Sequence, residues 1–141
     1  MTISSLAHEF FNAVHKNPQP YAKLSALIAS QPPTFETDWL DFKAAAQLQL
    51  QDENLKNIWS KALSGFANAG GGVLIFGIDA RKDKATGIDC ADKLALAPAA
   101  FALKSRLLEL HSVATDPPIQ GVRVECYTES DDRSPHPLFY L

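Results

Sequence analysis

The sequence predicts a single α/β domain in which a mixed β-sheet of about five or six strands is packed by two helices, with a helical segment in front of it. Three observations carry this prediction. Apolar residues recur at helical spacing over residues 55–66, a continuously apolar and β-prone run follows at residues 73–78, and apolar and polar residues alternate over residues 122–127. A helix, a buried strand and a half-exposed strand together indicate helices packed on a sheet.

The first 34 residues are expected to form a helical extension. Apolar residues recur at helical spacing from Leu6 to Val14 and again from Leu24 to Ile28, and prolines at positions 18 and 20 separate the two runs. The segment Gln31-Pro32-Pro33 ends this unit. We therefore divide the chain into an extension at residues 1–34 and a domain at residues 35–141. The extension either docks on the domain or binds a partner.

From Phe35 onward the pattern becomes that of a sheet with helices. The segment Trp39-Leu40-Asp41-Phe42-Lys43 mixes aromatic, apolar and charged residues and predicts a short strand. The amphipathic helix that follows stops at Gly70-Gly71-Gly72, where glycine can supply a left-handed cap. The apolar run at residues 73–78 is expected to be the central strand, covered on both faces.

A hairpin is predicted directly after Asp79, where a charged turn leads to Thr86-Gly87-Ile88. Arg81, Lys82 and Lys84 would lie at the tip of this hairpin. Such a basic cluster can contact phosphates, and it can equally be an ordinary solvated turn.

The rest of the chain predicts one more helix and two strands. Residues 94–110 are rich in leucine and have Pro98 near the start, where a helix tolerates proline. Residues 122–127 have the period of a half-exposed strand, and a last strand begins at Leu138 and should pair with it. The apolar end at Leu141 is typical of the amino-terminal part of a longer protein, and an open sheet edge there would favour a homodimer.

Composition limits the classes of function. With 141 residues, of which 46% are hydrophobic, the chain can form a core without disulfides or metal. Cys90 and Cys126 lack metal-binding spacing, so we expect two core thiols and no zinc. No secretory signal or window of roughly 20 apolar residues is visible, which predicts the cytoplasm and no membrane partner. Because the net charge is −3, nucleic-acid binding would require a local basic patch.

Three segments in a fixed order resemble the Schlafen Alba-like (AlbA_2) family. They are an acidic segment with Asp-Phe-Lys at residues 36–43, a helix ending Phe-Ala-Asn-Ala-Gly-Gly at residues 64–71, and Gly-Ile-Asp followed by a hairpin at residues 77–88. The resemblance covers about residues 35–141. It implies a nucleic-acid-binding or transcription-regulator module. In the vertebrate members the same positions form a metal-assisted endoribonuclease site, and two such domains are paired in one chain, so a comparable groove would here need a homodimer.

The resemblance implies a catalytic centre formed by Glu36, Asp41 and Asp79 as metal ligands, with Lys43 beside them. The family usually has Glu at the position of Asp41. Oxygen ligands of this kind suit Mg²⁺ or Mn²⁺. Strand parity places Asp41 and Lys43 on one face, and Glu36 can join them only if the chain bends near residues 37–38. The alternative is that these acids are surface charges, ion-pair partners or turn caps.

The predicted function is therefore binding of DNA or RNA, with metal-dependent cleavage of RNA as the enzymatic form. A non-enzymatic regulator is the rival, and a nucleotide-binding or partner-binding scaffold is a third class. The glycines at residues 70–72 precede a strand and no Gly-Lys-Ser/Thr follows them, so we do not expect them to bind ATP.

Overall fold

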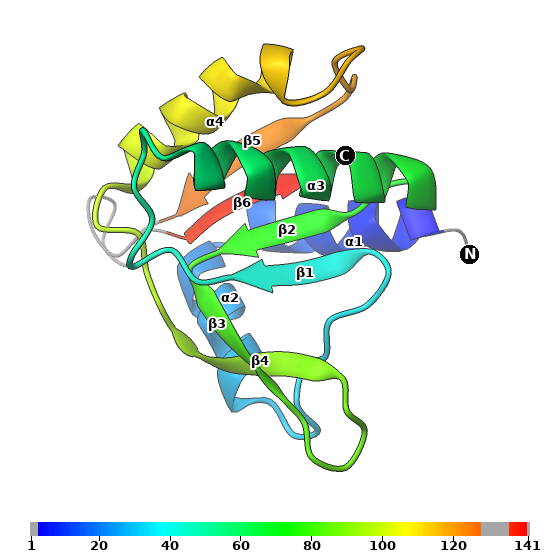
Figure 1. Cartoon of the computed structure of the whole chain (residues 1–141). Coiled ribbons are helices and arrows are strands. Elements are labelled where there is room, and N and C mark those ends of the chain that lie inside the picture. Colours follow the sequence, from blue (N-terminus) through cyan, green and yellow to red (C-terminus); the bar gives the residue numbers. More distant parts are fainter. Residues whose placement is uncertain (1–2, 128–135, 141) are drawn as a thin grey trace.

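A four-stranded sheet lies between two pairs of helices in the computed structural model of the chain (Figure 1), which describes residues 3–127 and 136–140. The helices are α1 (Ile3–His15), α2 (Pro20–Ala29), α3 (Glu53–Ala69) and α4 (Ala100–Ala114). The strands are β1 (Leu40–Lys43), β2 (Val73–Phe76), β3 (Ile78–Lys82), β4 (Asp89–Leu94), β5 (Arg123–Tyr127) and β6 (His136–Tyr140). This confirms the predicted mixed α/β architecture with a helical pair in front.

The main sheet has the strand order β1-β2-β6-β5. β1 runs parallel to β2, whereas β6 is antiparallel to both β2 and β5. All four residues of β2 are buried, as expected for a central strand covered on both faces. The apolar run at residues 73–78 is not one strand, because Gly77 adopts a φ of 118° and turns the chain into β3. β3 pairs with β4 in a separate two-stranded sheet.

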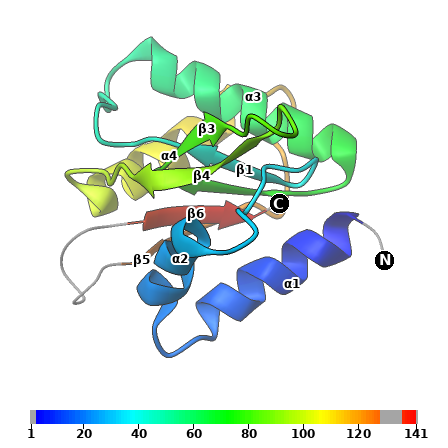
Figure 2. The ribbon, with the colours of Figure 1, turned by 90° about the horizontal axis from the view of Figure 1, so that it is seen from below.

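Alternate residues of β2 point into two cores. Leu74 and Phe76 pack with α3 and α4, where the largest fully buried side chain, Trp59, lies. Val73 and Ile75 pack on the other face against α1, α2 and β1, with Phe11 at 0% exposure. Figure 2 shows α1 and α2 on the side of the sheet opposite α3 and α4.

The helical extension is thus part of the core of the domain. α1 also reaches β5, because Nδ1 of His15 and the hydroxyl of Tyr127 are hydrogen-bonded at 2.8 Å. The guanidinium of Arg123 lies 4.5 Å from the centre of the Phe11 ring. The observed packing agrees with docking of the extension on the domain.

α3 has the boundaries that its sequence indicates. The side chain of Asp52 accepts a hydrogen bond from the backbone N–H of Asn54 at 3.0 Å and caps the amino end. At the other end Gly70 has a φ of 89°, and the N–H of Gly71 donates to the carbonyl of Phe66 at 2.7 Å. The glycine run is therefore a helix cap followed by a tight connection to β2.

The helix predicted over residues 94–110 begins later than expected. Residues 89–94 form β4, and α4 starts only at Ala100. The backbone N–H of Ala95 donates to the carbonyl of Gly77 at 2.8 Å, which keeps this segment tied to β3, and Pro98 has no N–H to donate. Within α4, Phe101 and Leu108 are 58% and 50% exposed.

β6 pairs with β5 as predicted, but it lies inside the sheet. Its other neighbour is β2, so the edges of the main sheet are β1 and β5. This central position was not predicted, because strand order depends on long-range pairing that local periodicity does not encode. The open edge and the homodimer stay predictions. Leu141 lies outside the described residues. None of the described helices combines the length and the apolar character needed to cross a membrane.

Candidate functional site

The chain bends sharply between Glu36 and β1, as the site requires. The N–H of Thr37 donates to the carbonyl of Leu40 at 2.9 Å, and the Thr37 hydroxyl oxygen accepts from the N–H of Leu40 at 3.0 Å. Glu36 is fixed from the other side, because its own N–H donates to the carbonyl of Asp89 in β4 at 2.8 Å. The bend returns the Glu36 side chain to the edge of β1.

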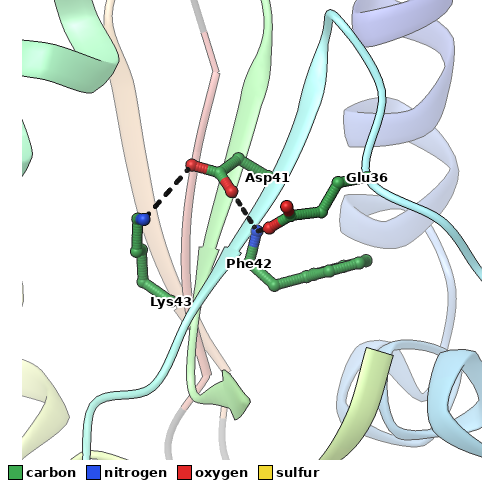
Figure 3. Close-up of polar contacts among 4 residues, drawn as sticks. All are labelled: Glu36, Asp41, Phe42 and Lys43. Atoms are coloured by element: carbon green, nitrogen blue, oxygen red, sulfur yellow. Dashed lines mark hydrogen bonds and ion pairs between the residues drawn. The ribbon is translucent and has the colours of Figure 1, made fainter. Parts of the chain in front are cut away.

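Two carboxyl groups meet at one backbone N–H of β1 (Figure 3). The N–H of Phe42 donates to Oε2 of Glu36 at 3.0 Å and to Oδ1 of Asp41 at 2.9 Å. β1 bonds to the β2 segment through alternate residues, with the carbonyl of Lys43 accepting from the N–H of Gly77, so the Phe42 N–H faces the open edge. Glu36 and Asp41, which we call the carboxyl pair, therefore lie at the free edge of the sheet.

The carboxyl pair holds a proton near neutral pH. The pKa of Glu36 is raised from 4.5 to about 7, mainly by burial and in addition by the hydrogen bond to Asp41 and the charge of Asp41, against the opposing effect of the Phe42 N–H. Nζ of Lys43 lies 3.9 Å from Oδ2 of Asp41 on the opposite side from Glu36. Asp41 thus lies between the carboxyl group of Glu36 and the ammonium group of Lys43.

The raised pKa predicts that the free energy of unfolding depends on pH through Glu36. A folded-state pKa above the unfolded one stabilises the protein below about pH 4.5, and this contribution is lost as the pH rises through about 7. For a half-buried group we expect a loss of about 1 kcal/mol. Urea unfolding of the wild type and Glu36→Gln between pH 5 and 8.5 measures it, since Gln keeps the hydrogen bonds without the charge.

The Glu36→Gln variant should gain stability relative to the wild type as the pH rises, and the two should converge near pH 5. Asp38→Asn is the control, because it removes an exposed acid two residues away. If the free energies of unfolding of the wild type and Glu36→Gln differ by the same amount from pH 5 to 8.5, the raised pKa of Glu36 is contradicted.

A groove of about 910 Å³ opens between β1 and α3, and we call it the α3 groove. Its sheet side is formed by Thr37, Asp38, Asp41 and Lys43. Its helix side includes Asn54, Asn57, Lys61, Gly65 and Asn68. Asp41 belongs to both the groove and the carboxyl pair. The α3 residues were not predicted from the sequence, although their spacing of three or four residues places them on one helix face.

Asp79, the third predicted acid, lies on β3. Its Oδ2 is 4.0 Å from Nζ of Lys93 in β4, and its side chain is 42% exposed. Residues 3–127 and 136–140 contain no group of three or more His, Cys, Asp or Glu side chains that could hold a metal ion. The structure thus brings Glu36, Asp41 and Lys43 together, and the contribution of Asp79 to a metal centre stays a prediction.

The predicted basic cluster is spread along the hairpin. Lys84 lies in the turn, whereas Arg81 and Lys82 are the last two residues of β3. Nε of Arg81 is 3.3 Å from Oδ1 of Asp92, and Nζ of Lys82 donates to the carbonyl of Gly87 at 3.4 Å. All three side chains are exposed.

Replacing Arg81, Lys82 and Lys84 together by Ala should weaken nucleic-acid binding and reduce its dependence on salt. Each lost phosphate contact lowers the slope of log K against log salt by about 0.7 for a single strand. Titrations from 50 to 300 mM salt measure the slope. The control removes three cations elsewhere, at Lys16, Lys23 and Lys104. If the triple variant and the wild type have the same slope of log K against log salt, the hairpin charges do not contact phosphates and only keep the turn solvated.

Both cysteines are free, with Cys90 buried and Cys126 partly buried. Burial raises the pKa of the Cys126 thiol. Cys90 is thus a core thiol as predicted, whereas Cys126 lies at the margin of the core.

Comparison with protein families gives one match. The family model described as Schlafen, AlbA_2 matches residues 36–128, which is more than half of the chain. This region contains the carboxyl pair, the α3 groove and the β3–β4 hairpin. The search of curated proteins gives no match.

Proposed function

Since this chain belongs to the Schlafen, AlbA_2 family, we propose that it binds nucleic acid at the edge of its sheet and cleaves RNA there with the help of a divalent metal ion. The family supports a nucleic-acid-related role. The observation that supports the finer proposal is the carboxyl pair, which converges on the Phe42 N–H beside the α3 groove.

The carboxyl pair suits a hard divalent cation. Mg²⁺ is commonly bound through one or two carboxylates, and waters and substrate phosphates complete its octahedron. Glu36 and Asp41 would hold such an ion, and Asp79 is the third predicted ligand. A bound Mg²⁺ or Mn²⁺ would supply charge stabilisation at the phosphate and a more acidic water.

Groups of the chain itself would prepare the site for a phosphate. The Lys43 ammonium, 44% exposed, lies at the groove side of Asp41 and can offset phosphate charge. The Phe42 N–H fixes both carboxyl groups, which limits the reorganisation needed when a ligand arrives. Glu36 can release a proton near pH 7.

A non-enzymatic binding module is the second candidate, and one observation favours it. Asp79 is ion-paired with Lys93, and the described residues form no three-acid cluster. A domain with only two convergent carboxylates can bind a nucleic acid through its basic groups without cutting it.

One experiment separates these functions. The purified protein is incubated with labelled structured RNA, single-stranded DNA and duplex DNA, with Mn²⁺ and with a chelator. We expect RNA products only with Mn²⁺. Salt-dependent binding without products would identify a binding module, and neither binding nor products would overturn the nucleic-acid proposal in favour of a scaffold.

A further inference from the structure

The helix side of the α3 groove is a row of exposed polar residues. Asn54, Asn57, Lys61, Gly65 and Asn68 follow one another at intervals of three or four residues and so share one face of α3. This face of α3 therefore presents carboxamide and ammonium groups to the groove.

Gly65 is unusual within this row. It lies in the interior of α3, where glycine is the poorest helix former except proline. Apart from its chain neighbours and the adjacent helix backbone, no atom of the described residues lies within 4 Å of a Cβ atom added at Gly65. Packing therefore gives no reason for glycine at this position, whereas close approach of a ligand to the helix backbone would give one.

The two sides of the groove run in opposite directions. α3 ends shortly before β2, and β2 is parallel to β1, so α3 runs antiparallel to β1 (Figure 1). Asn68 accordingly lies near the start of β1 with Asp38 and Asp41, and Asn57 lies toward Lys43 at its end. The groove thus carries acidic groups at Asp38 and Asp41 and basic groups at Lys43 and Lys61.

We infer that the α3 groove holds one unpaired nucleic-acid strand, with Lys43 and Lys61 at its phosphates and its backbone passing over Gly65. This inference rests on the proposed function and names the substrate form for that site. A groove of about 910 Å³ matches the size of small-ligand pockets, roughly 300–1,000 Å³, and has room for a few nucleotides of one strand. Asparagine side chains can pair with base edges that only an unpaired strand presents freely.

The inference predicts opposite effects on stability and binding at Gly65. Gly65→Ala should raise the melting temperature by roughly 2–5 °C, because alanine favours the helix. The same change should weaken binding of a labelled single-stranded RNA or DNA severalfold, and Gly65→Gln, which extends further into the groove, should weaken it about tenfold. Binding is measured with chelator present so that the probe stays intact.

Lys61→Ala should lower the salt slope of single-strand binding by about 0.7. Two controls lie on the same helix outside the groove lining: Lys56→Ala removes the same charge, and Ser64→Ala introduces the same residue next to Gly65. Neither should change affinity. The same probe annealed to its complement should bind at least tenfold more weakly than the single strand, and RNA and DNA forms show whether the sugar matters.

The results distinguish two errors: that the strand does not lie in the α3 groove, and that the protein does not bind nucleic acid at all. Unchanged binding by Gly65→Gln and Lys61→Ala, in a protein that still binds single strands, would overturn the α3 groove while leaving nucleic-acid binding in place. Tighter binding of the duplex would also overturn it. Absence of binding to every probe by the wild type would overturn both.

Discussion

Asp41→Asn should reduce Mn²⁺-dependent cleavage of structured RNA by roughly 100-fold or more, because it removes one of two convergent anionic oxygen ligands. The melting temperature should change little. The Asn oxygen can still accept from the Phe42 N–H, and Asp41 is not part of either apolar core. Cleavage is followed with labelled RNA at fixed Mn²⁺. Mn²⁺ should raise the melting temperature of the wild type and not that of the variant.

Asp79→Asn tests the third ligand in the same assay. An equally large loss with an unchanged melting temperature would add Asp79 to the centre, although its ion pair in the structure is with Lys93. Asp38→Asn is the matched control, since it removes an acid of the same groove that is not part of the carboxyl pair. Equal losses in Asp38→Asn and Asp41→Asn would show that general charge, and not metal ligation, governs the activity.

Gly72→Ala should destabilise the protein by about 2–3 kcal/mol, equivalent to a fall of roughly 5–10 °C in melting temperature. A Cβ atom at Gly72 would overlap the Phe66 ring, which is only 6% exposed and packs in the core shared with Trp59. The ring cannot swing into solvent without leaving that core. Thermal and urea unfolding measure the loss.

Gly65→Ala is the control for this effect, because the same substitution in open space should stabilise. Combining Gly72→Ala with Phe66→Leu should recover part of the loss, since the smaller side chain relieves the overlap. Strictly additive losses in the double variant would show that the Phe66 contact is not the cause.

Local signals in the sequence predicted α3, β2 and the hairpin. The period of apolar residues identified α3, Gly70 marked its end, and uninterrupted apolar character identified the buried strand. The break at Gly77 was missed because glycine in an apolar run is compatible with a strand until its φ of 118° is known. Apolar and polar residues alternate only weakly over residues 89–94, and this segment forms a strand by pairing with β3.

The candidate site was likewise predicted in part by local signals. Strand parity predicted that Asp41 and Lys43 share one face of the strand. It also predicted that Glu36 can join them only if the chain bends, and the bend is found at Thr37. Lys61 was not identified, because an exposed lysine on a helix resembles any solvated face. Its significance depends on α3 running antiparallel beside β1, and that arrangement arises from long-range packing.

The bend before β1 also bears on solubility. The outward N–H groups of Leu40 and Phe42 are both occupied, by the Thr37 hydroxyl and by the carboxyl pair, so this edge offers few donors to a strand from another molecule. The acids proposed to serve a metal ion thus also protect the sheet from edge-to-edge aggregation. Alanine substitutions of Glu36 and Asp41 would remove that protection together with the ligands, whereas Gln and Asn would retain it.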